Sequence, residues 1–152
     1  TEVGVKEPPA TFSACFGEPF MPMHPGVYAD LLSAKMAEHG ATAWLINTGW
    51  SGGAYGVGER MKIRYTRAML NAALDGELDH VAYVTDARFG FEVPASCPGV
   101  PDDVLQPRET WGDGAAYDAT ADRLAQMFNE NFSRYAEGVS DAVNAAAPAP
   151  LS

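Results

Sequence analysis

Five glycines lie close together near the middle of this sequence, and basic residues follow them directly. The glycines occupy positions 49, 52, 53, 56 and 58, between an apolar run at 43–46 and a helical pattern at 63–74. We expect them in a turn between a strand and a helix, where α/β proteins bind ligands. Because glycine adopts positive φ and has no side chain, backbone N–H groups in such a turn can approach a ligand closely.

Four of the ten Lys and Arg residues of the chain follow these glycines within eight positions, at Arg60, Lys62, Arg64 and Arg67. The formal net charge is -10, so we expect no nucleic-acid and no membrane partner, since both require an extended basic face. A local cationic cluster in an acidic chain favours a small anion, which would offset the unfavourable position of cations at a helix N-terminus. The alternative is a solvated face on which Arg residues pair with carboxylates.

The spacing of a phosphate-binding loop and the pattern of a hydrolase nucleophile overlap in the glycine segment. Gly53 and Gly58 have the spacing of a phosphate-binding loop, but Glu59 and Arg60 stand where that loop needs Lys and Ser or Thr, which argues against a triphosphate cradle. Residues 49–53 match the Gly-x-Ser-x-Gly pattern of hydrolases, with Ser51 as nucleophile. His80 is the one downstream His available for a triad. A serine hydrolase therefore stays open as an alternative.

Composition indicates one domain and no metal centre. His24, His39 and His80 are scattered, and no HxxxH, HExxH or CxxC spacing occurs, so we expect no metal ligands. Two cysteines indicate reduced thiols and a cytoplasmic location. No run of 18 apolar residues predicts a membrane span. The start at Thr1, without a signal peptide, suggests the middle of a longer protein.

Hydrophobic periodicity and Gly/Pro positions predict an α/β protein with Pro-rich loops. Helices are expected from 25 to the stop at Gly40, over 63–74 up to Gly76, and over 114–137. A buried strand is expected at 43–48, with further strands at 80–85 and 89–93. The segments 1–24 and 94–112 are expected to be irregular.

Blocks of residues across nearly the whole chain resemble the ATP-dependent phosphoenolpyruvate carboxykinases, in the order in which that family has them. This combination is specific to the family and is not found in nucleotide-binding proteins in general. The blocks are residues 12–25, 44–53, 55–68, 97–101, 105–108 and 128–132.

The resemblance implies the C-terminal part of the carboxykinase fold, a mixed sheet with flanking helices and long Pro-rich loops. Residues 1–138 would be the nucleotide-side domain portion, and 139–152 a frayed Ala/Pro tail. The family converts oxaloacetate and ATP to phosphoenolpyruvate, CO₂ and ADP, using Mg²⁺ with the nucleotide and Mn²⁺ at the chemistry. Its catalytic and metal-binding groups lie upstream in the family, so this chain would hold no metal ligand and be inactive alone.

The resemblance also assigns ATP contacts to Arg60, Met61 and Thr66 and no catalytic residue to this chain. The planar guanidinium of Arg60 can stack on a purine or donate two parallel hydrogen bonds to phosphate oxygens. The Thr66 hydroxyl can form a hydrogen bond with the edge of the base. The family often has Lys where this chain has Glu59, which removes one positive charge near the nucleotide. A non-catalytic regulatory domain is the remaining alternative.

Overall fold

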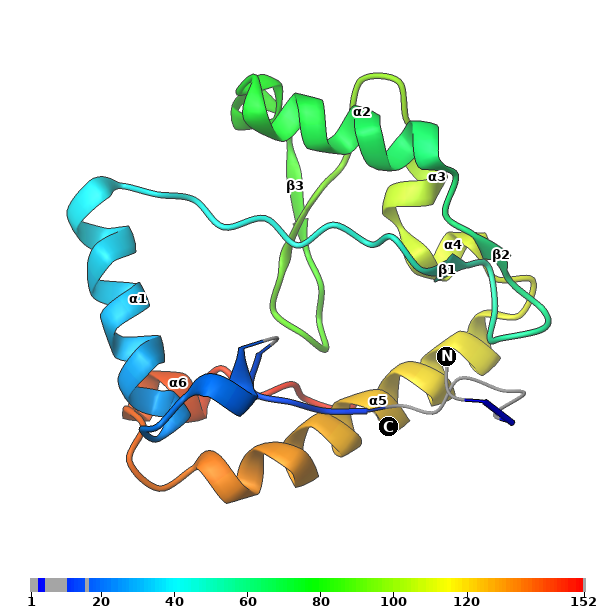
Figure 1. The fold of residues 1–152 in the computed structure, drawn as a ribbon. Helices are drawn as coiled ribbons and strands as arrows, with labels where there is room; N and C mark the ends of the chain where they lie inside the picture. The colour runs from blue at the N-terminus through cyan, green and yellow to red at the C-terminus, as the bar shows by residue number, and fades with distance from the viewer. Residues whose placement is uncertain (1–2, 5–10, 16, 152) are drawn as a thin grey trace.

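The chain is described here from a computed structural model, which covers residues 3–4, 11–15 and 17–151. One small hairpin lies between the helices and a second lies at an edge of the molecule, and a long extended segment joins the first helix to the hairpin at the edge (Figure 1). Part of the predicted irregular segment 1–24 lies outside the described residues. The helices and strands are η1 (Glu18–Phe20), α1 (Pro25–His39), β1 (Trp50–Ser51), β2 (Glu59–Arg60), α2 (Ile63–Leu74), η2 (Glu77–His80), β3 (Tyr83–Thr85), β4 (Glu92–Pro94), α3 (Asp102–Leu105), α4 (Pro107–Thr110), α5 (Gly114–Phe132), η3 (Ser133–Tyr135) and α6 (Asp141–Ala145).

The helix predicted from residue 25 is confirmed as α1, and local chemistry explains both of its ends. The His24 imidazole accepts a hydrogen bond from the Gly26 N–H at 3.1 Å, and Pro25 occupies the first turn, where no N–H is needed. Gly40 ends the helix with φ of 60°, a left-handed conformation that glycine adopts without a steric penalty.

The buried strand predicted at 43–48 is not formed. This segment runs extended from α1 to β1, and it forms no strand with the described residues (Figure 1). Trp44 and Ile46 are half-buried, whereas Ala43 and Leu45 are exposed, so the side chains alternate as in a strand. The apolar run correctly indicated extended backbone, but a strand also needs a paired neighbour, which local sequence does not reveal.

The α/β class is confirmed, but the strands form two separate antiparallel pairs instead of one mixed sheet. In the first pair Trp50 opposes Arg60, and in the second Thr85 opposes Glu92. The strand expected at 80–85 is shortened because His80 belongs to η2, a 3₁₀ turn that follows Gly76. The hydroxyl of Tyr83 donates to the Leu78 carbonyl at 2.8 Å and ties β3 to that turn.

The buried core lies between α2, η2, α3 and the segment before α3. Its buried members are small or medium-sized, and Trp44, Tyr65 and Met69 pack against them while remaining partly exposed. Burial raises the pKa of the Cys97 thiol, and the nearby charge of Glu77 adds to that shift. The buried apolar residues of this cluster are Ala72, Leu78, Cys97, Val100 and Leu105.

The long helix α5 is capped at its N-terminus, and the C-terminal segment packs against it. The Asp113 carboxylate accepts from the N–H groups of Ala115 and Ala116, an N-cap that satisfies two free donors.

None of the helices within the described ranges combines the length and apolarity that crossing a bilayer requires.

The described residues of the segment expected to be a frayed tail, 139–151, contain α6 and form three hydrogen bonds to the rest of the molecule. The Leu151 N–H donates to the buried carboxylate of Asp122 at 2.9 Å. The Ala149 N–H donates to the Arg88 carbonyl at 2.8 Å, and the Asn129 amide donates to the Pro148 carbonyl at 2.9 Å. These bonds hold residues 148–151 against α5 and the β3–β4 hairpin.

Candidate functional site

The glycine segment closes the β1–β2 hairpin, so the expectation of a turn from a strand directly into a helix is wrong in this detail. Gly52 and Gly56 have φ of 79° and 85°, which other residues adopt only at a cost. A Cβ on Gly58 would lie 2.5 Å from the Gly53 carbonyl oxygen, so the loop can close only around glycine. A hairpin therefore carries β2 to the start of the next helix.

The hairpin positions Arg60, Met61 and Lys62 at the junction of β2 and α2. The Met61 N–H donates to the Gly49 carbonyl at 2.7 Å, which extends the hairpin ladder by one bond. Lys62 is the N-cap of α2 in extended conformation, and its carbonyl accepts from the Tyr65 N–H at 2.9 Å. Two elements thus fix the backbone of the cationic segment.

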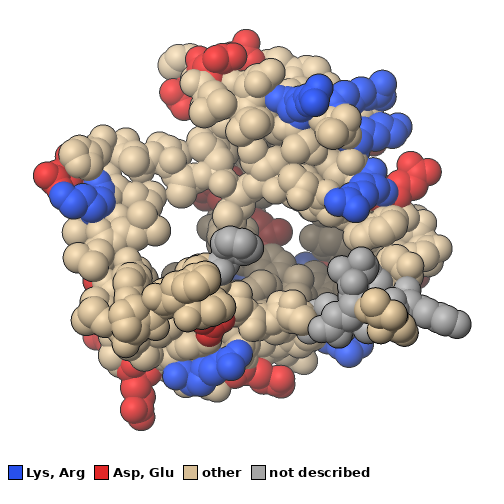
Figure 2. Space-filling model, in the orientation of Figure 1, with Lys and Arg blue, Asp and Glu red and all other residues tan. Residues whose placement is uncertain are grey.

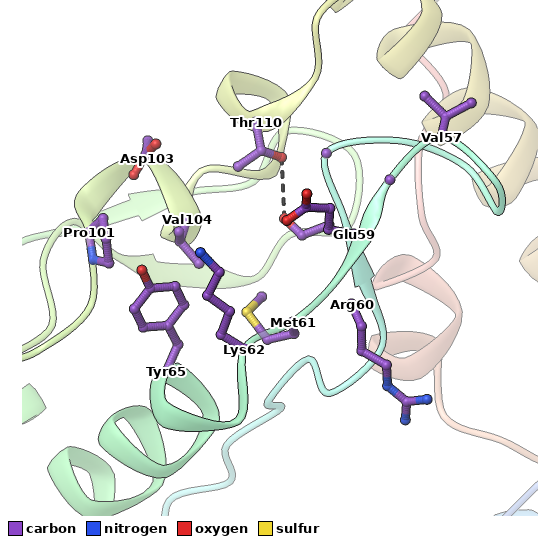
Figure 3. Close-up of a pocket in the computed structure, with 13 residues that line it drawn as sticks. Val57, Glu59, Arg60, Met61, Lys62, Tyr65, Pro101, Asp103, Val104 and Thr110 are labelled. Carbon is purple, nitrogen blue, oxygen red and sulfur yellow. Dashed lines mark hydrogen bonds between the residues drawn. The ribbon is translucent and has the colours of Figure 1, made fainter.

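A pocket of about 390 Å³ lies between this hairpin, the first turn of α2, and the helices α3 and α4 (Figure 3). Apolar surface comes from Met61 and Val104, and an aromatic ring from Tyr65. Carboxylates come from Glu59 and Asp103. The pocket is large enough for a small molecule, and its lining mixes apolar, hydroxyl and charged groups.

Lys62 and Tyr65 contribute to this pocket. Sequence reasoning placed Lys62 in the cationic cluster but assigned it no nucleotide contact, and it gave Tyr65 no role. The ammonium of Lys62 lies 5.8 Å from the centre of the Tyr65 ring, and Figure 3 shows its side chain directed toward Val104. Arg64 covers the same ring at 4.8 Å and donates to the Tyr65 hydroxyl at 2.9 Å. The available signal was their spacing, because residues three apart share one face of a helix.

Arg60 also lines the pocket, but its guanidinium points out of it toward solvent (Figure 3). Within the part of the chain that the structure describes, no ion pair joins Arg60, Lys62, Arg64 or Arg67 to a carboxylate. Lys and Arg side chains gather at the corner of the molecule formed by β2 and the start of α2 (Figure 2). The Arg–carboxylate pairs of the alternative interpretation are therefore not found among the described residues, and these four cations are exposed to solvent.

Thr66 lies on α2, half-buried, and does not line this pocket. Its N–H donates to the Lys62 carbonyl at 3.2 Å as part of the first helical turn. The structure thus brings Arg60 and Met61 to one pocket and leaves Thr66 outside it. A contact between Thr66 and a nucleotide stays a prediction.

Ser51 has a hydroxyl as its partner, and not the imidazole that a hydrolytic triad requires. Its Oγ donates to Thr110 Oγ1 at 3.4 Å, and that hydroxyl donates to the Pro107 carbonyl at 2.7 Å. This chain of bonds ties β1 to α4. Among the described residues, no group of three or more His, Cys, Asp or Glu side chains is arranged to hold a metal ion.

Comparison with known proteins identifies the family. The sequence model of phosphoenolpyruvate carboxykinase matches residues 1–103, which is more than half of the chain. The chain belongs to the phosphoenolpyruvate carboxykinase family. It is 59% identical to the phosphoenolpyruvate carboxykinase (ATP) of Geotalea uraniireducens over 143 residues, and 59% identical to that of Paracoccus denitrificans over 147 residues. It is 57% identical to that of Thermus thermophilus over 148 residues.

These matches cover nearly all of the chain but only a small part of the relatives. The alignments take in 94% of this chain for the Geotalea relative and 97% for the other two. They take in 27% or 28% of the relatives' length. The chain therefore corresponds to about a quarter of a carboxykinase, and membership of this family gives the serine hydrolase interpretation no support.

Proposed function

We propose that this chain is the C-terminal portion of an ATP-dependent phosphoenolpyruvate carboxykinase and contributes to holding ATP. The complete enzyme would convert oxaloacetate and ATP to phosphoenolpyruvate, CO₂ and ADP. The observation that carries the proposal is 59% identity to enzymes named phosphoenolpyruvate carboxykinase (ATP) over 94% to 97% of the chain. The cationic segment without internal carboxylate partners, beside an open pocket, is the feature of the structure that supports nucleotide binding.

The side chains of the β2–α2 junction suit both parts of a nucleotide, the apolar purine ring and the negatively charged phosphates. Met61 offers an apolar, polarisable surface for the purine. Arg60 is exposed and can stack on a purine or bind phosphate oxygens with two parallel N–H groups. Lys62 adds a second cation on the pocket side of the same junction. The Thr66 hydroxyl, on the next turn of α2, would reach the base edge from outside the pocket.

The metal ions of the proposed reaction would be held by groups outside this chain. Mg²⁺ would accompany the nucleotide, and Mn²⁺ would act at the site of decarboxylation and phosphoryl transfer. The described side chains offer no cluster of metal ligands, so we assign no metal-binding role to them. In phosphoryl transfer the protein acts mainly by positioning and by neutralising charge. Arg60 and Lys62 would serve the second purpose from this side of the nucleotide.

Replacing Arg60 by Ala in the complete enzyme tests the proposal. We expect the KM for ATP to rise by about tenfold or more, because a hydrogen bond to a charged group contributes roughly 1.5–3 kcal/mol. The KM for oxaloacetate should stay nearly unchanged. The complete enzyme can be the natural polypeptide that carries this chain. It can also be the Paracoccus denitrificans relative with its matching segment replaced by this chain.

Arg67→Ala is the matched control, because Arg67 is exposed in the same cluster but does not line the pocket. It removes the same charge and should change the KM for ATP far less. Equal effects of Arg60→Ala on both substrates, or equal effects of the two Arg variants on ATP, would contradict the proposed role.

A further inference from the structure

The β1–β2 hairpin, which carries Arg60, rests against the C-terminal end of the short helix α4. The Ser51 hydroxyl on β1 donates to Thr110 Oγ1 at 3.4 Å, and the Thr110 hydroxyl donates to the Pro107 carbonyl at 2.7 Å. The first of these bonds joins residues that are 59 positions apart in the sequence. Within the described part of the chain, no other hydrogen bond connects residues 49–61 to a distant element.

The backbone of the hairpin also lies close to α4. A Cβ on Gly52 would be 3.1 Å from the Thr110 carbonyl oxygen, which is closer than side chains normally approach a backbone atom. Gly56 has a similar φ, 85° against 79° at Gly52, but a Cβ there would meet no atom within 4 Å. The close approach to α4 is therefore specific to position 52 and is not shared by the whole loop.

Helix α4 is held in turn against the long helix α5. Arg108 donates from Nε and Nη2 to the two carboxylate oxygens of Asp118, at 3.1 Å and 3.0 Å. A Cβ on Gly114 would lie 2.9 Å from Arg108 Nη2, so the guanidinium lies directly on the backbone of the first turn of α5. A bidentate pair restrains orientation as well as distance. The end of α4 at which Thr110 lies is therefore a fixed support for the hairpin.

The register of the hairpin connects this support to Arg60. Ser51 opposes Glu59, the residue directly before Arg60, and Trp50 opposes Arg60 itself. The two strands have only two residues each, and a ribbon of two strands is marginally stable alone. Thr110 lies across the pocket wall from this ribbon (Figure 3). A hairpin released from α4 would therefore move Arg60 with it.

We propose that Thr110 is a positioning residue for ATP binding. Its hydroxyl and its carbonyl hold the β1–β2 hairpin in the place where the Arg60 guanidinium meets the nucleotide, and Thr110 itself contacts no substrate. This inference rests on the proposed function, because it takes Arg60 as a contact of ATP. It also gives the Ser51 hydroxyl a purpose that needs no imidazole, since that hydroxyl joins β1 to α4.

Thr110→Val in the complete enzyme tests the proposal, because valine keeps the shape of the side chain and lacks the hydroxyl. We expect the KM for ATP to rise by about threefold or more, which is the loss of roughly one hydrogen bond. The kcat and the KM for oxaloacetate should stay nearly unchanged, and Thr110→Ser should restore most of the loss. Thr120→Val is the matched control, since its exposed hydroxyl donates to the Ala116 carbonyl within α5 and reaches no other element.

The double variant shows whether Thr110 acts through Arg60. In Arg60→Ala the added Thr110→Val change should raise the KM for ATP no further, because residues that act as one unit are not additive. A full additional rise would overturn the proposal. So would an unchanged KM for ATP in Thr110→Val beside a raised one in Arg60→Ala, which would leave the proposed function standing. No effect of Arg60→Ala would remove the ATP role and this inference together.

A pair of glycine variants tests the same support without removing a hydrogen bond, and it applies even if Thr110→Val does not fold. Gly52→Ala and Gly56→Ala both place a side chain at positive φ, but the methyl group at position 52 alone of these two presses on the Thr110 carbonyl. We expect a KM for ATP at least about threefold higher in Gly52→Ala than in Gly56→Ala, because small displacements of a binding group weaken its contact. Equal KM values in the two variants would count against the support.

Discussion

At the scale of single residues, the candidate site depends on which cations have partners inside the molecule. Arg88 and Arg108 bind carboxylates, and the pKa of Asp118 is lowered chiefly by its hydrogen bond from Arg108. Arg60 and Lys62 have no such partner among the described residues. Paired cations hold the fold together, and the unpaired ones are available to bind an anion.

The pair of Arg88 and Asp122 gives a prediction about stability. Asp122 is 4% exposed and accepts from Arg88 Nε at 2.6 Å as well as from the Leu151 N–H at 2.9 Å. Removing one partner of a buried ion pair leaves an uncompensated charge and costs about 3–5 kcal/mol. Asp118 stays 3.3 Å from Arg88, so we expect Asp122→Ala to lower the free energy of unfolding by about 3 kcal/mol. Denaturant titration measures this loss.

Lys35→Met is the control for that measurement. It removes an ion pair with Glu38 in which both side chains are more than half exposed, and such pairs contribute roughly 0–1 kcal/mol. Asp122→Ala should also speed amide exchange at Leu151, whereas Lys35→Met should not. If the two variants lost similar stability, Asp122 would not hold the C-terminal segment as described.

At the scale of elements, sequence predicted what local chemistry determines. The ends of α1 and α2 followed from Pro25, Gly40 and Gly76, because capping and helix termination involve neighbouring residues. The strand at 43–48 and the single mixed sheet were wrong, since pairing partners are distant in sequence. The glycine segment was correctly predicted to be a turn. The sequence did not show that a second strand, β2, precedes the helix, because that strand forms only by pairing with Trp50 and Ser51.

The same limit applied to the site. Arg60 and Met61, to which the family resemblance assigns ATP contacts, both line the pocket, and their contact with a nucleotide stays a prediction; the resemblance did not indicate Lys62. Lys62 faces the pocket because it lies between the end of β2 and the start of α2. The direction of the chain at this residue depends on the β1–β2 hairpin. The unpredicted part of the site is therefore the part set by non-local pairing.

The β1–β2 hairpin gives a prediction at this scale. A Cβ on Gly58 would lie 2.5 Å from the Gly53 carbonyl oxygen and 2.7 Å from that of Ser51, and neither backbone atom can move without opening the loop. We expect Gly58→Ala to cost about 1–3 kcal/mol, as overpacking does, and to speed exchange at the Met61 amide. Gly112→Ala is the matched control, because a Cβ there meets no atom within 4 Å. Equal stability of the two variants would show that the loop is looser than described.

At the scale of the whole molecule, the small core and the large exposed surface belong together. Buried apolar residues are few and none of the described large side chains is fully buried, whereas Leu31, Leu45 and Ile63 are each more than 60% exposed. A domain of this length normally buries about two-thirds of its unfolded surface. The chain therefore has the surface of a part that packs against more polypeptide, in agreement with its coverage of 27% to 28% of its relatives.

The final prediction concerns activity and separates the chain from the enzyme. We expect the purified 152-residue chain to form no phosphoenolpyruvate from oxaloacetate and Mg·ATP with Mn²⁺ present, because it corresponds to about a quarter of a carboxykinase. The Paracoccus denitrificans relative carrying this chain in place of its own matching segment should be active. The measurement is phosphoenolpyruvate release under identical conditions, with the Arg60→Ala form of the chimera as a second comparison. Turnover by the chain alone that persists through repeated purification would contradict the prediction, because its own residues would then have to supply the catalytic groups. An inactive chimera that is folded by circular dichroism would instead indicate that the 59% identity does not preserve the contacts between the two portions.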